Sequence, residues 1–146
     1  MILITGFEPF GLIGRILKIN PSEEVARKLY KEIKENVDLL ILPVNKDCIN
    51  ILKNELENHK YKFIFMMGYG GSFRIETRTS KGEISKFARR IKEEMGLMTK
   101  ENIGDYYCDK VYSEALKYNP KTIFIHLPIY PNYLKIKDIL NECKKW

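Results

Sequence analysis

The chain has 146 residues, 45% of them hydrophobic, which suits one domain, residues 1–146, with a single core. The formal net charge of +6 is dispersed, because lysines and arginines alternate with glutamates and no finger or ribonucleoprotein motif appears; nucleic acid is therefore not an expected partner. No apolar run reaches the roughly 18 residues that a membrane-spanning helix needs. The three cysteines lack CxxC spacing, which argues against a disulfide framework or a metal site and favours a cytoplasmic protein with reduced thiols.

The first half of the chain alternates apolar strands with amphipathic helices. Residues 2–5 predict a strand, and Asn20-Pro21-Ser22-Glu23 then offers an N-cap, a proline at the first helical position and an early carboxylate. These signals predict a helix over about 20–35. The apolar spacing that follows predicts a buried strand over 38–44, a helix with Cys48, Ile49, Leu52 and Leu56 towards the core, and a third strand over 61–67.

The middle of the chain is marked by glycines. Gly68, Gly70 and Gly71 follow the third strand and release the backbone, as a turn at the edge of a sheet requires. Residues 73–79 alternate like a strand, and the run Ser80-Lys81-Gly82-Glu83 resembles a capping box. It predicts a helix that ends near Gly96, with a buried stripe made of Ile84, Phe87, Ala88, Ile91 and Met95.

The last third of the chain predicts two more strands and two more helices. A short strand over 97–99 leads to a helix that the run 104–109 opens and Asn119-Pro120 ends, and a strand follows over 121–126. The closing helix, 133–145, has Leu134 available for packing and Cys143 at its periphery. Alternation of this kind predicts an α/β protein, a three-layer α/β/α fold with a mainly parallel central sheet.

Parallel sheets place ligands beyond the carboxyl ends of their strands, so the residues at those ends form the candidate site. Phe7 follows the first strand, Gly68 the third and Cys108 the short fourth, and His126 ends the last strand. We expect these residues to converge on one rim. The glycine segment matches neither GxGxxG nor GK[ST], which argues against a nucleotide-phosphate cradle.

Cys108 and His126 form the pair with the clearest chemistry. A thiol becomes a nucleophile when a helix N-terminus and a neighbouring imidazolium lower its pKa, and both conditions hold if these two segments meet. Taken singly, each residue has a plainer interpretation, because free cysteines are often buried and a histidine at a strand end is often a structural group. The pair therefore predicts a cysteine hydrolase, with a structural role as the alternative.

A specific family resemblance rests on five ordered motifs spread over residues 1 to 128. They are Thr5-Gly6-Phe7-Glu8-Pro9-Phe10-Gly11, Asn20-Pro21-Ser22, Leu42-Pro43-Val44, Gly104-Asp105-Tyr106-Tyr107-Cys108-Asp109 and Phe124-Ile125-His126-Leu127-Pro128. With these motifs the chain resembles the pyrrolidone carboxyl peptidases, also called pyroglutamyl-peptidase I. The resemblance implies an α/β/α fold that assembles as a homo-oligomer, commonly a tetramer, and that removes N-terminal pyroglutamate from peptides.

The resemblance also implies roles for individual residues. Cys108 is the expected nucleophile, His126 its base and Glu76 the carboxylate that orients the imidazole, while Phe7 and Phe10 line the lactam pocket. Two further candidates for substrate contact come from the glycine segment: Gly68 at its start, and Arg74, whose charge suits a developing oxyanion. The alternative for Arg74 is a solvated side chain. Neither a metal nor a cofactor is expected.

The chain also departs from the family pattern. The family's Glu-Arg-x-Ala-x-Asn signature is replaced by Glu76-Thr77-Arg78-Thr79-Ser80, and the segment between Glu76 and the helix that follows is short. The stretch 12–19 is longer than usual, and we expect it to cover part of the pocket. Two alternatives to an active peptidase stay open on the sequence alone. One is a catalytically degenerate homologue that binds a small ligand or a partner, and the other is a structural or interaction protein.

Overall fold

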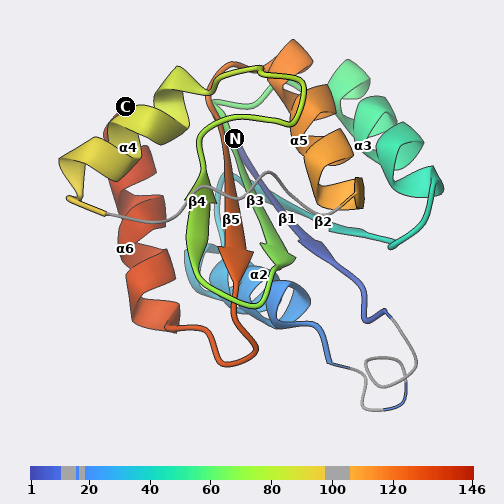
Figure 1. Ribbon diagram of the computed structural model, residues 1–146, viewed down its shortest axis with the longest axis horizontal. Helices are drawn as coiled ribbons and strands as arrows, with labels where there is room; N and C mark the ends of the chain where they lie inside the picture. Colours follow the sequence, from blue (N-terminus) through green and yellow to red (C-terminus); the bar gives the residue numbers. More distant parts are fainter. Residues whose placement is uncertain (11–15, 17–18, 98–105) are drawn as a thin grey trace.

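The computed structural model of the chain describes residues 1–10, 16, 19–97 and 106–146, and it is built around one five-stranded sheet (Figure 1). The strand order is β2-β1-β3-β5-β4. The strands are β1 Ile2–Phe7, β2 Val37–Leu42, β3 Phe63–Tyr69, β4 Arg74–Glu76 and β5 Thr122–Leu127. β1, β2, β3 and β5 run parallel, while the edge strand β4 pairs with β5 in the antiparallel sense.

Helices cover both faces of this sheet, which confirms the predicted three-layer fold (Figure 1). Apolar residues of α2, α4 and α6 join one core cluster, and those of α3 and α5 join the other. The bounds are α2 Pro21–Ile33, α3 Asp47–Asn58, α4 Lys86–Glu94, α5 Tyr106–Tyr118 and α6 Tyr133–Cys143. No helix in the described part of the chain is both long and apolar enough to cross a membrane.

Alternation along β5 decides which side chains face α3 and α5. Ile123, Ile125 and Leu127 pack into the core under α2, α4 and α6, and Phe124 packs into the opposite core with Cys108. Because side chains alternate with a period of two, His126 lies on the same face as Phe124. The register of the sheet thus directs His126 towards the helix that carries Cys108.

The helix after β4 starts later than predicted. α4 begins at Lys86 and is capped by the side chain of Ser85, which accepts a hydrogen bond from the Ala88 N–H. The predicted capping box at 80–83 was wrong, since residues 78 and 84 pair as a β-bridge and close a turn between them. Ile84 consequently precedes the helix and is 48% exposed, so it does not belong to the buried stripe.

Two predictions about α6 were also wrong. Cys143, expected at the periphery, is fully buried, and Leu134, expected in the core, is 71% exposed. The buried positions Ile136, Ile139, Leu140 and Cys143 follow the i, i+3, i+4, i+7 spacing of one helix face. Leu134 does not lie on that face.

Some predicted features fall outside the described residues. These are the strand over 97–99 beyond Leu97, the opening residues 104–105 of the Cys108 helix, and most of the stretch 12–19. Leu97 itself is not part of a strand. From Tyr106 onward the predicted Cys108 helix is present as α5, and it ends just before Asn119-Pro120, as expected.

Candidate active site

A buried histidine–carboxylate pair lies where β4 meets β5. His126 Nδ1 is 2.9 Å from Glu76 Oε1, and the two side chains are 1% and 4% exposed. The antiparallel register pairs Glu76 with Phe124, so Glu76 and His126 are diagonal neighbours on one face of the sheet. An ionised carboxylate only accepts hydrogen bonds, so its contact places the proton of a neutral imidazole on Nδ1. Nε2 then carries a lone pair and can act as a base.

The second ring nitrogen of His126, Nε2, takes no part in the contact with Glu76. Nε2 is buried and has no hydrogen-bond partner among the residues that the structure describes. A buried polar atom of this kind is uncommon and is often explained by a catalytic role or a bound ligand. Nε2 is thus available for a proton from a neighbouring nucleophile.

Arg74 stabilises the carboxylate of this pair. Its Nε donates to the same Glu76 oxygen at 3.2 Å, and its Nη1 donates to the Gly70 carbonyl at 3.1 Å and to Ser72 Oγ at 2.8 Å. The residue is only 9% exposed, so the interpretation of Arg74 as a solvated side chain was wrong. Its guanidinium holds both the carboxylate and the glycine turn.

Cys108 comes from the other side of the site, in the first turn of α5. The residue is 9% exposed, and it lines a small cavity together with Glu76, His126 and Arg78. The remaining wall of this cavity is formed by Asp109, Tyr112 and Phe124. The structure therefore brings the nucleophile candidate, the base candidate and the carboxylate to one place, as the sequence predicted.

Two glycines allow this close approach. A Cβ atom at position 68 would lie 2.8 Å from Cys108 Sγ, and one at position 70 would lie 2.6 Å from His126 Cδ2. Real Cβ atoms essentially never approach other heavy atoms so closely. Gly68 and Gly70 are therefore needed because the two functional side chains occupy the space that a larger residue would fill. The missing side chain at Gly68 thus makes room for the Cys108 sulfur.

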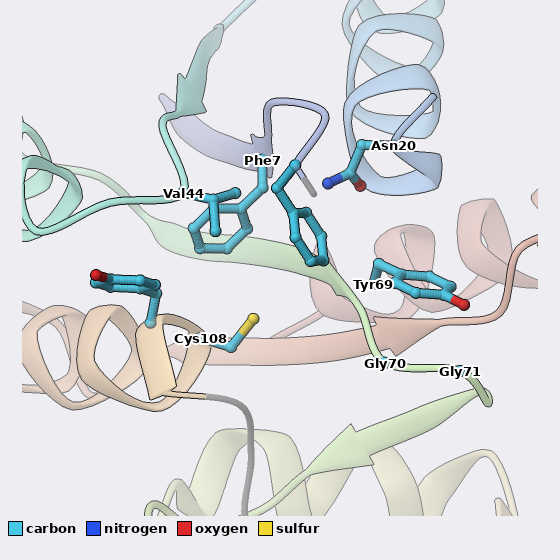
Figure 2. Close-up of a pocket in the computed structure, with 9 residues that line it drawn as sticks. Phe7, Asn20, Val44, Tyr69, Gly70, Gly71 and Cys108 are labelled. Atoms are coloured by element: carbon cyan, nitrogen blue, oxygen red, sulfur yellow. The ribbon is translucent and has the colours of Figure 1, made fainter. Parts of the chain in front are cut away.

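A larger cavity of about 560 Å³ adjoins Cys108 (Figure 2). Both aromatic residues predicted for the pocket, Phe7 and Phe10, line it. In Figure 2 the Cys108 sulfur points into the space between Phe7 and Tyr69. The full lining consists of Phe7, Phe10, Asn20, Val44, Tyr69, Gly70, Gly71, Tyr107 and Cys108. Gly68 and Arg74, the other two predicted contact residues, are not among them.

The loop that presents Phe7 and Phe10 is held by the start of α2. Asn20 caps this helix by accepting from the Ser22 N–H at 3.0 Å, and its amide donates to the Glu8 carbonyl at 3.0 Å. Ser22 Oγ in turn accepts from the Phe7 N–H at 2.9 Å. These bonds explain why the two motifs occur together in the sequence, since the second one fixes the backbone of the first.

Sequence reasoning assigned no pocket role to four lining residues. They are Asn20, Val44, Tyr69 and Tyr107, of which three stand inside motifs that the sequence analysis quoted. The signal was thus present, because Tyr107 immediately precedes Cys108 and Asn20 opens a motif. Tyr69 lies at the end of β3, two residues beyond the strand predicted over 61–67.

The arrangement is suited to acyl transfer by a thiolate. A base within a shared cavity can deprotonate the thiol, a carboxylate fixes the tautomer of that base, and a helix N-terminus favours negative charge on sulfur. The lining beside Cys108 is largely apolar, which suits a neutral substrate group.

We predict that Gly70→Ala will displace the His126 imidazole, because the new Cβ has no room beside the ring. The NMR chemical shifts of the His126 ring protons would change, whereas those of His59, which is exposed, provide an internal reference. Gly71→Ala is the matched control: its φ of +79° makes alanine strained, but no atom lies within 4 Å of the new Cβ. Unaltered chemical shifts of the His126 ring in Gly70→Ala would contradict the steric argument.

We also predict that Cys108 will be alkylated faster than the other two cysteines. Burial raises the pKa of the Cys48 thiol and of the Cys143 thiol, so both stay protonated near neutral pH, whereas Cys108 shares a cavity with His126. Brief iodoacetamide treatment followed by peptide mapping would measure the three rates. The prediction fails if Cys48 or Cys143 is modified first across neutral pH.

Comparisons with known proteins agree with this fold. The family model described as pyroglutamyl peptidase matches residues 1–81. A pyrrolidone-carboxylate peptidase of Fusobacterium nucleatum is 37% identical over 97 residues, a match that covers 65% of this chain but only 43% of that relative. A second one, of Lactobacillus acidophilus, is 26% identical over 179 residues, covering 92% of this chain and 86% of the relative.

Solved structures show the same fold at lower identity. The pyrrolidone carboxyl peptidase of Thermus thermophilus aligns with a TM-score of 0.69 at 20% identity, covering 99% of each chain. That of Pyrococcus furiosus aligns with a TM-score of 0.66 at 19% identity, covering 99% of this chain and 96% of the other. Since the family model matches more than half of the sequence, this chain belongs to the pyroglutamyl peptidase family.

Proposed function

We propose that the protein is a cysteine omega-peptidase that removes N-terminal pyroglutamate from peptides. The observation that carries this proposal is the buried contact of 2.9 Å between His126 Nδ1 and Glu76, in the cavity that also contains Cys108. Membership of the pyroglutamyl peptidase family supports the same reaction. In this proposal Cys108 is the nucleophile, His126 the general base and Glu76 the orienting carboxylate.

The reaction proceeds in two acyl-transfer steps. His126 Nε2 takes the proton of the Cys108 thiol, and the thiolate attacks the carbonyl carbon that joins pyroglutamate to the next residue. The imidazolium then gives its proton to the leaving amine as the C–N bond breaks, which leaves a thioester. A water molecule, deprotonated by His126, attacks the thioester, and the C–S bond breaks to release pyroglutamate and the thiol. Backbone N–H groups at the start of α5 are the candidate donors to the oxyanion.

The wall of the larger cavity favours a lactam over a free N-terminus. None of the side chains that line it within the described part of the chain is an aspartate or a glutamate, so a charged α-amino group would be desolvated without a counter-ion. Pyroglutamate carries no such charge. Phe7 and Phe10 provide apolar surfaces for the ring, while Asn20 and Tyr69 add polar groups to the same wall.

The protein's setting follows from the same proposal. A thiol nucleophile needs reducing conditions, and all three cysteines are free, which supports the cytoplasm as its compartment. We further propose that residues 1–146 act as one domain whose substrate is a pyroglutamyl peptide. Assembly into a homo-oligomer, which the family resemblance implies, stays a prediction.

The purified protein should release a reporter amine from an N-terminal pyroglutamyl amide but not from the matching prolyl amide. A site that pairs with the lactam N–H and C=O leaves those partners unsatisfied when the ring carbonyl is missing, which costs about 1–3 kcal/mol for each buried group. Release would be followed from about pH 6 to 9, the range that brackets ordinary histidine and cysteine titration. Cleavage no faster than that of Cys108→Ala at every pH would refute the peptidase and leave the binding-only homologue as the better interpretation.

Glu76→Gln should reduce kcat/KM less than Cys108→Ala does, because Glu76 orients His126 but forms no bond to substrate. Loss of the carboxylate also leaves Arg74 without its charged partner, so the thermal unfolding midpoint should fall together with activity. Steady-state kinetics and a melting curve on the same preparation would separate the two effects. Unchanged kcat/KM would reassign Glu76 to a purely structural role.

A further inference from the structure

Three side chains of α5 bind the end of β4 and the segment that follows it. Asp109 accepts from the Ser80 N–H at 2.7 Å and also from the Ser80 hydroxyl, and Ser113 Oγ donates to Glu83 at 2.5 Å. Between these contacts, Tyr112 Oη donates to the backbone carbonyl of Glu76 at 2.6 Å. We call Asp109, Tyr112 and Ser113 the α5 tether. Their i, i+3, i+4 spacing places them on one face of the helix that carries Cys108.

Tyr112 has the most direct connection to the site. It is 2% exposed and lines the same small cavity as Cys108, which lies one turn earlier on α5. Its ring packs against Phe124 at 5.7 Å between centroids, and Phe124 packs against the His126 ring at 5.0 Å. Tyr112 therefore contacts the backbone of Glu76 through its hydroxyl and supports the ring beside His126 through its apolar face.

This contact matters because Glu76 sits at the end of a weakly supported strand. β4 has three residues and is the edge strand of the sheet, so its ladder hydrogen bonds come from β5 alone. The β4–β5 pairing sets Glu76 relative to His126, but it does not set either residue relative to α5. The α5 tether supplies that second restraint directly, from the nucleophile's own helix.

We propose that Tyr112 is a positioning residue which, with the rest of the α5 tether, sets the separation between Cys108 and the Glu76–His126 pair. The inference rests on the proposed role of Cys108 as the nucleophile. It assigns to Tyr112 no contact with substrate. Its effect is on the geometry in which the thiol and the imidazole exchange a proton.

The reactivity of the Cys108 thiol depends on its separation from His126. The charged or titratable side chains that line the small cavity with Cys108 are Glu76, Arg78, Asp109, Tyr112 and His126. Of these, only Arg78 and a protonated His126 favour a thiolate, and their attraction falls as the separation grows. A helix that shifts away from His126 should thus have a less reactive Cys108 near neutral pH.

Tyr112→Phe tests the inference because it removes one hydroxyl and keeps the ring. Cys108 should then be alkylated roughly tenfold more slowly at pH 7, as expected when one buried hydrogen bond that fixes a reactive group is lost, and its rate profile should move to higher pH. The kcat/KM for the pyroglutamyl amide should fall with KM unchanged. Tyr118→Phe is the matched control, since it removes a hydroxyl on the same helix that donates to Glu57 at 3.1 Å on the surface. It should behave as the wild type.

The outcomes distinguish a positioning role of Tyr112 from a role in stabilising the fold alone. If Tyr112→Phe lowers the melting temperature but leaves the alkylation rate and its pH profile unchanged, the positioning role is overturned. If this variant does not fold, Ser113→Ala tests the same tether, and wild-type alkylation there overturns the proposal. A wild-type protein that does not cleave the pyroglutamyl amide, but whose Cys108 is slowed by Tyr112→Phe, would retain the positioning role and refute the peptidase.

Discussion

The antiparallel pairing of β4 with β5 is the constraint on which the site depends. The other strands are parallel, and β4 alone turns back along its neighbour. This reversal pairs Arg74 with His126 and Glu76 with Phe124, so a cation, a carboxylate and an imidazole meet on one face. The connection between β3 and β4 has to cross the end of β5, which lies between these two strands in the sheet. Gly71 in this connection has a φ of +79°, and Gly70 leaves room for the histidine ring.

Arg74, Glu76 and His126 are all buried where β4 pairs with β5. Their burial is tolerated because each group forms a hydrogen bond or ion pair with another member of the set. An isolated buried carboxylate would be strongly destabilising, but Glu76 Oε1 lies 2.9 Å from His126 and 3.2 Å from Arg74. The guanidinium also donates to the glycine turn, so the charge pair and the backbone geometry stabilise one another. The site is therefore an integral part of the sheet edge, and a change to one member alters the position of the others.

The sequence was sufficient for the layers and for the meeting of Cys108 with His126, because these depend on periodicity and on the rule for strand ends. It was insufficient where distant contacts decide. Ser80 was predicted to cap a helix, yet its hydroxyl donates to Asp109 on α5, and Ser85 caps α4 instead. Cys143 is a different case, because it continues the i, i+3, i+4, i+7 face that Ile136, Ile139 and Leu140 define, so the local pattern did contain the signal for its burial.

The family model covers one member of the candidate site, and the structure brings the other two to it. The matched residues end at position 81, so they include Glu76 but neither Cys108 nor His126. In the fold, however, β5, which carries His126, lies between β3 and β4, and α5, which carries Cys108, packs on the sheet face that Phe124 and His126 share. Both later residues therefore lie next to elements that the family model matches. The segment after Glu76 is short, and α5 holds it with side chains adjacent to the nucleophile. The edge of the sheet and one helix are thus enough to bring Glu76, His126 and Cys108 to one cavity.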